Sequence, residues 1–429
     1  MKPRRSPALL PKSRVAALTA LRSCLRGGQD LQPALDAAIR QGGLDARDAG
    51  LATQLVYGTL RLKGRLYALL ERFLDDPGRI PAKLRDILEL ASYELLFLDK
   101  VPGYASVDWA VSAARADCGQ GLAGLANAVL RKVSLLGDAV HDPQFYREGA
   151  RDEAAFLSRW YSCPEWIVRM WRAQMPPAGV LAALKAQTAP PALGLRLNPF
   201  HASHDALRAD LTTRDGLLLA DGPCFAFAPG SLSAAELEPV LASGALSRQS
   251  AASQFAVLGL APASWPGPIW DACAGRGGKS LLLAELGLSP ALASDLSATR
   301  SSGLPGECAR LGIPAIPTVR SLADAPPLAS WSGTILIDAP CSGLGVLSRR
   351  PDSKWRRTAR DCKELVVLQR RILVSCYGLL ESGGALAYLT CTLNRDENEN
   401  AVAYLRMAHP EAQLVLERRA DPASPLGEC

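Results

Sequence analysis

The sequence has no apolar segment suited to crossing a bilayer, and it has few residues of the kinds that bind metals. Its longest stretch without a charged residue, 249–270, contains three prolines together with serine and glutamine, so it is a poor membrane span. The basic first residues also contain three prolines and lack a small-residue cleavage pattern, which distinguishes them from a secretory signal. There are only four histidines, and the eleven cysteines form no Cys-x-x-Cys pair, which argues against a zinc site and a disulfide framework. We therefore expect a cytoplasmic protein without a bound metal or a membrane partner.

The sequence does contain enough apolar residues for several folded domains. At 429 residues it is long for one domain, and its 48% hydrophobic and 21% charged residues are typical of globular proteins. The formal net charge of +6 suits a nucleic-acid partner without identifying one. Seven basic and no acidic side chains lie in residues 2–26, and a second basic cluster lies in residues 349–360. Each cluster alone could be an ordinary solvated face, but the two together favour contact with phosphates.

Three regions with different patterns follow one another along the chain. Residues 1–140 have apolar positions at three- and four-residue spacing, such as Leu84, Ile87 and Leu88, which predicts a bundle of helices. Residues 150–248 combine an aromatic-rich helical stretch with a short strand-like run, which predicts a small α+β region. Residues 249–429 alternate short apolar strands with helices, which predicts a parallel, doubly wound α/β sheet.

A glycine-rich turn separates the first predicted strand of the α/β region from the following helix. Its sequence, Asp-Ala-Cys-Ala-Gly-Arg-Gly-Gly-Lys at 271–279, allows backbone N–H groups to approach a ligand at the helix start. It is not a P-loop, because Cys273 stands where that pattern needs its first glycine. Asp295, at the end of the next predicted strand, has two oxygens that match the vicinal hydroxyls of a ribose, although it could instead cap a helix. The turn and the acid together favour a nucleoside cofactor.

Two cysteines directly follow apolar strands, at the edge where doubly wound sheets hold their active sites. Cys341 lies in Asp-Ala-Pro-Cys-Ser-Gly at 338–343, and Cys391 lies in Leu-Thr-Cys-Thr at 389–392. A free cysteine is most often a small buried side chain, but two in equivalent positions favour a nucleophilic thiolate. Asp338, three residues before Cys341, could hydrogen-bond or protonate a base ring. The residues alone do not decide which cysteine is the nucleophile.

Together these motifs resemble the S-adenosylmethionine-dependent RNA (cytosine-5)-methyltransferases of the NOL1/NOP2/Sun family. The most specific stretches are 335–355 and 388–400, and 195–199 and 248–254 give weaker support. The N-terminal helices resemble the NusB antitermination fold, which precedes the catalytic domain in the bacterial members of the family that act on 16S ribosomal RNA. The resemblance implies an all-α NusB-like RNA-binding domain at 1–140, an α+β linker or RNA-binding region at 150–248, and a Rossmann-like methyltransferase domain at 249–429.

The resemblance also implies a reaction and a set of site residues. The reaction is methylation of carbon 5 of a cytosine in 16S rRNA, with Cys391 adding to carbon 6. Asp338 would hydrogen-bond the ring at N3, and Cys341 would assist release of the product. The segment after Cys391, with Asn394, Glu397 and Asn398, matches the family and is expected to be structural. The residues implied for binding S-adenosylmethionine are Cys273, Ala274, Gly275, Arg276, Gly277, Gly278, Lys279, Asp295 and Asp338.

The target base must reach this site unpaired or extruded, because carbon 6 is shielded within a stacked helix. We expect the helical bundle and the α+β region to hold the RNA backbone. Arg349, Arg350 and Lys354 of the second basic cluster are expected close to the target nucleotide. We expect the protein to act as a monomer.

The sequence departs from the family at three places. Gly275 and Arg276 replace Ala-Pro in the glycine turn, and Ser250 replaces an aspartate. Residues 318–321 stand where the family has a Gly-Asp pair that contacts adenine, and Asp324 is the nearest acid. These losses favour a noncatalytic RNA-binding or ribosome-assembly factor as the alternative, whereas the retained lysine, acids and two cysteines oppose it. A methyltransferase acting on DNA or a small molecule is disfavoured by the basic helical region.

Overall fold

The computed structural model describes residues 10–99, 101–326 and 328–420, and the chain divides into two compact units. The first unit is Met1–Met175 with Arg350–Arg356, and the second is Pro176–Arg349 with Arg357–Cys429. The start of the basic cluster at residues 2–26 lies outside the described residues. In the described ranges, no helix is long and apolar enough to cross a membrane. Nor does that part of the chain gather three His, Cys, Asp or Glu side chains in a way that could hold a metal ion.

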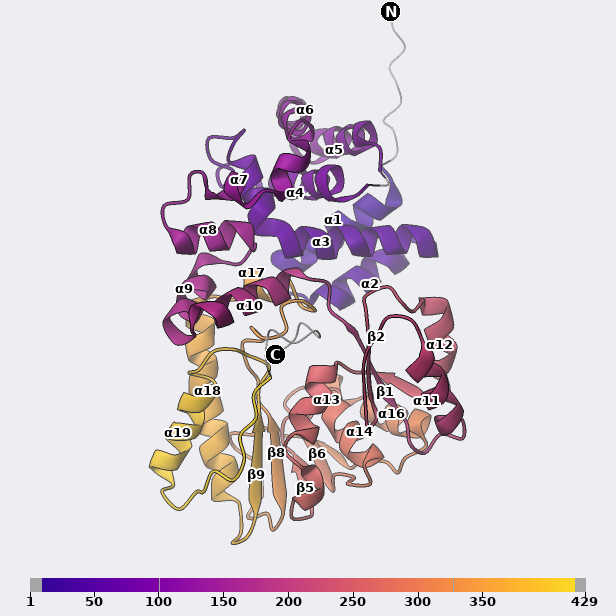
Figure 1. The fold of residues 1–429 in the computed structure, drawn as a ribbon, viewed down its shortest axis with the longest axis vertical. Helices are drawn as coiled ribbons and strands as arrows, with labels where there is room; N and C mark the ends of the chain where they lie inside the picture. The colour runs from indigo at the N-terminus through magenta and orange to yellow at the C-terminus, as the bar shows by residue number, and fades with distance from the viewer. Residues whose placement is uncertain (1–9, 100, 327, 421–429) are drawn as a thin grey trace, which may run out of the picture. The chain divides into compact units, whose positions relative to one another are not determined.

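The first unit is a bundle of helices, which confirms the prediction from apolar spacing (Figure 1). A short segment from the C-terminal half of the chain, the helix α17, also belongs to it. The elements are α1 (Lys12–Leu25), α2 (Leu31–Gly42), α3 (Ala46–Leu70), α4 (Ala82–Phe97), α5 (Gly103–Cys118), α6 (Gln120–Ser134), η1 (Gly137–His141), α7 (Pro143–Arg147), α8 (Glu153–Trp160), α9 (Glu165–Gln174) and α17 (Ser353–Arg356).

Ion pairs orient the helices of this bundle as well as apolar packing does. Helix α4 carries buried acids among its apolar positions, and each is paired, because an isolated buried charge is unfavourable. Arg14 of α1 contacts Glu94 at 2.6 Å, and Lys63 of α3 contacts Glu89. These pairs fix the rotation of α4 against its neighbours.

The second unit begins with a four-stranded antiparallel sheet in the order β2-β3-β1-β4. One face packs on two helices through a core that includes Leu195, Phe225 and Phe227. On the other face, Cys224 and Ala226 pack against the helix α13, so both faces are covered. The elements are α10 (Pro177–Thr188), β1 (Leu193–Leu197), α11 (His204–Thr213), β2 (Leu217–Asp221), β3 (Cys224–Phe227), α12 (Ala234–Ala242), β4 (Leu246–Arg248) and α13 (Ala251–Leu258).

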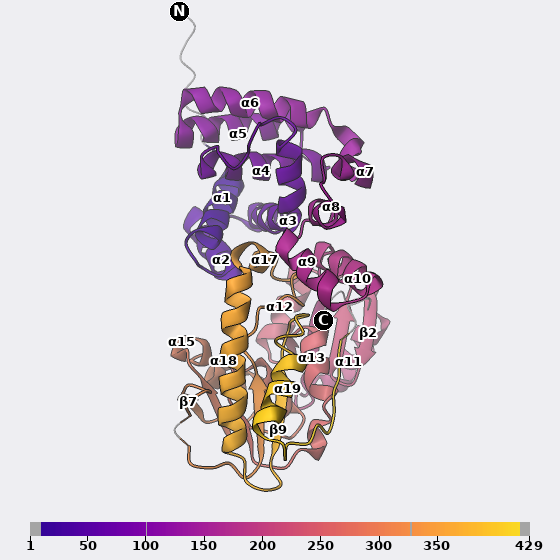
Figure 2. The same ribbon diagram turned by 90° about the vertical axis from the view of Figure 1, so that its left-hand side faces the viewer.

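A five-stranded parallel sheet follows in the order β7-β6-β5-β8-β9, which confirms the predicted doubly wound α/β fold. Along β8, Ile335 and Ile337 face α18 and α19, whereas Leu336 faces α13 and α14. Figure 2 shows α18 and α19 together beside this sheet. The elements are η2 (Pro262–Ser264), β5 (Ile269–Asp271), α14 (Gly278–Glu285), β6 (Leu292–Asp295), α15 (Ala298–Ser301), α16 (Leu304–Leu311), β7 (Thr318–Arg320), β8 (Thr334–Asp338), α18 (Ala359–Gly378), β9 (Ala385–Leu389) and α19 (Glu399–Ala408).

Candidate functional site

The carboxyl ends of the parallel strands bring most of the predicted site residues to one edge of the sheet. The chain runs outward from β5 through β6 to β7 and then returns to β8 and β9 on the other side. The strand order therefore reverses between β5 and β8, and doubly wound folds bind ligands at the carboxyl ends of the strands beside such a reversal. Asp271, Asp295 and Asp338 are the last residues of β5, β6 and β8.

The turn after β5 depends on its glycines. Gly275 and Gly277 have φ angles of +58° and +82°, in the left-handed region that favours glycine. A Cβ at Gly277 would lie 2.3 Å from Cδ1 of Leu304, so a side chain there would clash. A Cβ at Gly275 would have no heavy atom within 4 Å among the described residues. The turn therefore presents its backbone to an open space in which a ligand could lie.

Asp295 ties the next strand to this turn. Its Oδ2 accepts a hydrogen bond from the Gly275 N–H at 3.0 Å, and its Oδ1 accepts one from the Ser297 N–H at 2.7 Å. The bond from Gly275 joins the acid to the turn. The bond from Ser297 is the one expected if Asp295 caps the following helix, the alternative that the sequence left open. Each carboxylate oxygen has a further lone pair that can accept a hydroxyl. A carboxylate beside an open glycine turn fits the ribose of a nucleoside cofactor.

The departures from the family pattern have structural counterparts. Arg276 is exposed at the turn. Asp324 forms an ion pair with Arg371 of α18 at 3.1 Å, so its carboxylate is already engaged away from the turn. The Ser321 N–H donates to the backbone oxygen of Asp295 at 3.2 Å. Residues 318–321 thus support Asp295 through the backbone and bring no acidic side chain to this place.

Lys279 and Asp338 form an ion pair that the sequence did not predict. Lys279 Nζ donates to Asp338 Oδ2 at 2.5 Å. Burial by itself would lower the pKa of Lys279, but the negative charges of Asp338 and Cys391 outweigh it and raise this pKa. The ammonium therefore stays charged beside both groups. A neighbouring cation favours the thiolate form of a cysteine.

The two predicted cysteines meet at this edge. Their Sγ atoms are 3.1 Å apart, and the Cys391 N–H donates to Cys341 Sγ at 3.3 Å. The hydrogen bond with Cys391, burial, and the negative charge of Cys391 raise the pKa of Cys341 well above its usual range. Two thiolates at this distance would repel each other, so the pair retains a proton. The raised pKa of Cys341 favours keeping that proton on Cys341.

A buried carboxylate, Glu397, lies behind the cysteines and accepts four hydrogen bonds. Its Oε1 accepts from Ser342 Oγ at 2.6 Å and from Asn394 Nδ2 at 3.0 Å. Its Oε2 accepts from the Ser342 N–H at 2.8 Å and from Gln369 Nε2 at 3.0 Å. These donors come from three separate segments, so the carboxylate joins them at one point.

This carboxylate fixes the loops that carry the two thiols. Ser342 directly follows Cys341, and Thr392 directly follows Cys391. Ser342 Oγ lies 2.8 Å from Thr392 Oγ1, which links the two loops beside Glu397. The sequence placed Glu397 in a family-like segment but gave no sign that it contacts the residue after Cys341, because the two positions are 55 residues apart.

The structure separates the members of the second basic cluster. Arg350 is exposed, whereas Arg349 Nη2 donates to the Ala192 carbonyl at 2.7 Å, just before β1. Lys354 has no exposed surface, and its Nζ donates to the Arg61 carbonyl of α3 at 3.2 Å. Because the Lys354 side chain is enclosed in the helical unit, it cannot reach a phosphate, and the expectation that Lys354 contacts RNA is wrong. The charge pattern alone could not distinguish a buried lysine from an exposed one.

We expect Lys354 to make the stability of the first unit depend on pH. Burial lowers its pKa from the 10.5 of the unfolded chain to about 7. Between these values the folded protein binds fewer protons than the unfolded one, so stability rises with pH, by up to about 1.4 kcal/mol per unit. Lys354→Met should remove this slope.

Urea unfolding of the full chain, followed by tryptophan fluorescence between pH 7 and 10, measures the effect. Lys363→Met, which changes an exposed lysine of α18, is the matched control and should keep the slope. Equal slopes in the wild type and in Lys354→Met would refute the prediction.

Comparisons with known proteins agree with this architecture. Residues 257–425 match the family of 16S rRNA methyltransferases RsmB/F, and residues 11–135 match the NusB family. Ribosomal RNA small subunit methyltransferase B of Pseudomonas putida is 32% identical, over 96% of this chain and 93% of its own length. The protein of the same name from Vibrio cholerae is 31% identical, over 96% of this chain and 92% of its own. The crystal structure of PH0851 superposes with a TM-score of 0.74 at 22% identity, covering 97% of this chain and 93% of that chain, which establishes likeness of fold alone.

Proposed function

Because the chain belongs to the ribosomal RNA small subunit methyltransferase B family, we propose that it methylates carbon 5 of a cytosine in 16S rRNA. We propose S-adenosylmethionine as the methyl donor and a covalent adduct between Cys391 and carbon 6 of the base as the intermediate. Because the proposed substrate is ribosomal RNA, we propose that the protein acts in the cytoplasm. The observation that carries the proposal is the pair of thiols at the ends of β8 and β9, 3.1 Å apart.

The thiol pair supports an addition mechanism because carbon 5 of cytosine is a weak nucleophile. Addition of the Cys391 thiolate to carbon 6 pushes an electron pair into the ring and makes carbon 5 enamine-like. Asp338, oriented by Lys279, must carry a proton in this step, because N3 of the ring is an acceptor on which negative charge develops and only a protonated carboxyl can donate a hydrogen bond to it. Lys279 thus has two roles in the addition step: its positive charge favours the attacking thiolate, and its hydrogen bond orients Asp338.

The residues of the glycine turn and Asp295 would hold the cofactor. S-adenosylmethionine, when bound, supplies a methyl group on a positively charged sulfur, which makes that methyl group electrophilic. Asp295 would accept hydrogen bonds from its ribose, and the turn from Cys273 to Gly278 would pass beside its amino-acid part. Arg276 stands in this turn as an additional cation that the family pattern lacks.

Release of the product requires a base to remove the proton from carbon 5. The largest causes that raise the pKa of Cys341 include its hydrogen bond with Cys391 and the negative charge of that residue. Once Cys391 is bonded to carbon 6 it is no longer an anion, so this charge no longer opposes deprotonation of Cys341. Cys341 then loses its own proton to water and, as a thiolate, accepts the carbon-5 proton, and the electron pair left on carbon 5 expels the Cys391 thiolate from carbon 6.

A transfer assay tests the proposal. The full chain is incubated with S-adenosylmethionine labelled in its methyl group and with unmodified 16S rRNA, and the RNA is digested to nucleosides. Label in 5-methylcytidine is the expected result. If no RNA is labelled and no cofactor binds, the proposed activity is wrong, and the noncatalytic RNA-binding alternative takes its place.

We expect Arg350 to contribute to RNA binding through phosphate contact. It is exposed, and no hydrogen bond or ion pair of its side chain is seen in the described residues. Arg350→Ala should weaken RNA binding several-fold and reduce the slope of log affinity against log salt by about one. Arg406→Ala, an exposed arginine on α19, is the control and should change neither quantity. Filter binding at several salt concentrations measures both, and unchanged affinity and slope in Arg350→Ala would contradict the prediction.

A further inference from the structure

Arg196 is a buried cation in β1, the first strand of the four-stranded sheet, with 1% of its surface exposed. Burying a guanidinium is unfavourable unless polar and charged partners replace water. Its strand neighbours, Cys224 of β3 and Ser247 of β4, bring no charge. The compensation must therefore come from outside the sheet.

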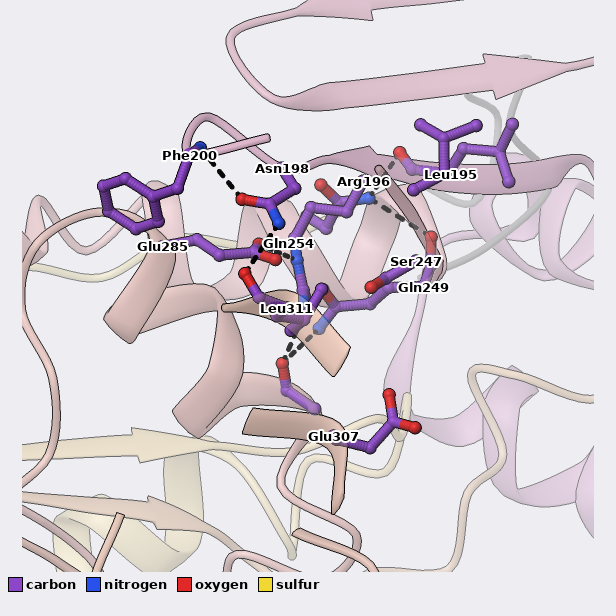
Figure 3. A network of polar contacts seen from close by, with 12 residues as sticks. Leu195, Arg196, Asn198, Phe200, Ser247, Gln249, Gln254, Glu285, Glu307 and Leu311 are labelled. Atoms are coloured by element: carbon purple, nitrogen blue, oxygen red, sulfur yellow. Dashed lines mark hydrogen bonds and ion pairs between the residues drawn. The ribbon is translucent and has the colours of Figure 1, made fainter. Parts of the chain in front are cut away.

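The partners of Arg196 lie next to the glycine turn of the α/β sheet. Figure 3 shows its side chain pointing from β1 toward Glu285 and Gln249. Nε donates to Glu285 of α14, and Nη1 donates both to Gln249 Oε1 and to the Gly278 carbonyl, the last at 3.1 Å. The side chains of Arg196 and Glu285 are 2% and 1% exposed, so the ion pair is enclosed.

The Gly278 carbonyl receives a second donor from outside its own helix. Gln249 Nε2 donates to it at 3.1 Å. Gln249 is itself held by Gln254, whose Nε2 donates to the Gln249 carbonyl at 3.2 Å and to the Leu195 carbonyl at 3.1 Å. Gly278 is the first residue of α14 and directly follows the turn in which Gly275 and Gly277 have positive φ. The buried Arg196 and the half-buried Gln249 thus hold the point where the turn becomes a helix.

We propose that Arg196 and Gln249 are positioning residues for the glycine turn, which they hold in the conformation that binds the cofactor. They act through the Gly278 carbonyl. The identity of the cofactor as S-adenosylmethionine rests on the proposed function. On this proposal, the face of the four-stranded sheet that carries the buried Arg196 supports the cofactor turn.

A second attachment of the same sheet provides a matched control. Arg310 of α16 donates to the Leu241 carbonyl at 2.7 Å, to the Leu246 carbonyl at 3.1 Å and to Ser247 Oγ at 3.0 Å. This arginine also joins the four-stranded sheet to a helix of the α/β part, but none of these bonds involves α14. A change at Arg310 therefore reports what loosening the sheet does by itself.

Three variants of the full chain separate the two attachments. Arg196→Lys keeps the charge but loses the forked geometry that reaches Glu285 and Gly278 together. Gln249→Glu keeps the oxygen that accepts from Arg196 and replaces the donor to Gly278 with an oxygen that repels its carbonyl. Arg310→Lys makes the same change as the first variant at the second attachment. Gln249→Glu also covers the case in which Arg196→Lys does not fold.

Hydrogen exchange of the peptide spanning 272–283, measured without cofactor, shows how firmly the backbone of the turn is held. We expect exchange there to be at least about tenfold faster in Arg196→Lys and Gln249→Glu than in wild type, and unchanged in Arg310→Lys. Calorimetry should show an S-adenosylmethionine Kd raised about five- to twentyfold in the first two variants and within about twofold in Arg310→Lys. RNA affinity should stay within about twofold in all three.

Wild-type exchange at 272–283 in both Arg196→Lys and Gln249→Glu would overturn the positioning role. Equal losses of cofactor affinity in those variants and in Arg310→Lys would overturn it too, because the effect would then belong to the sheet as a whole. If the wild type binds no S-adenosylmethionine, the proposed function fails. The exchange comparison still decides the positioning role in that case.

Discussion

Replacing Cys391 with alanine should lower the rate of methyl transfer by at least about a thousandfold, whereas replacing Cys341 with alanine should leave RNA covalently attached to the protein. On the proposed mechanism, the first change removes the thiolate that makes carbon 5 reactive. The second leaves that thiolate in place and removes the group that accepts the carbon-5 proton. The two cysteines are 3.1 Å apart, yet their variants are expected to fail at different steps.

The two variants are expected to differ because Cys391 raises the pKa of Cys341. On the proposed mechanism, Cys341 therefore carries the proton until Cys391 bonds to carbon 6, and Lys279 favours negative charge on Cys391. Alanine at 341 removes a thiol but not this cation. Addition to carbon 6 therefore continues, and the adduct accumulates because elimination is slowed.

Denaturing gels with labelled 16S rRNA separate these outcomes. Cys341→Ala should give a band of protein joined to RNA, which is absent from Cys391→Ala and from the double variant. The double variant is the control, because it shows that the trapped species depends on Cys391. A trapped band in Cys391→Ala and none in Cys341→Ala would reverse the assignment and make Cys341 the nucleophile.

The sequence predicted the fold in those regions where the spacing of apolar residues is compatible with only one type of secondary structure. Short apolar strands alternating with helices after about residue 268 indicated a parallel sheet, and the structure has one. Both faces of this sheet are covered, so Ile335, Leu336 and Ile337 are all buried, and an uninterrupted apolar run is the expected signal. The helical spacing of residues 1–140 was equally direct.

The sequence could not predict contacts between distant segments. Lys354 follows the motif predicted to be catalytic and belongs to a basic run, which favoured an exposed position. Residues 350–356 instead belong to the helical unit, and Lys354 is buried there. Arg196 was noticed only as part of a weak motif, although it lies beside the glycine turn. In each case the decisive partner is more than 80 residues away, and spacing along the chain carries no information about it.

Glu397→Gln tests the buried network behind the cysteines. The carboxylate accepts two hydrogen bonds on each oxygen, and an amide nitrogen in either place would face N–H donors. Unmatched buried donors cost about 1–3 kcal/mol each, so we expect a loss of about 3 kcal/mol in unfolding free energy. Because Ser342 and Thr392 would shift with their loops, we also expect methyl transfer to slow by about a hundredfold.

Asp396→Asn is the matched control, because the side chain of this exposed neighbour accepts a hydrogen bond from the exposed Asn400 at 2.7 Å. It should change stability by less than about 0.5 kcal/mol and leave the rate unaltered. Thermal unfolding and the transfer assay measure both quantities at a temperature where all the variants are folded. If Glu397→Gln lost stability but kept the wild-type rate, Glu397 would stabilise the fold without setting the position of the thiols. A lower rate together with a changed pH dependence of thiol alkylation is the result expected if it holds the two cysteines at their working separation.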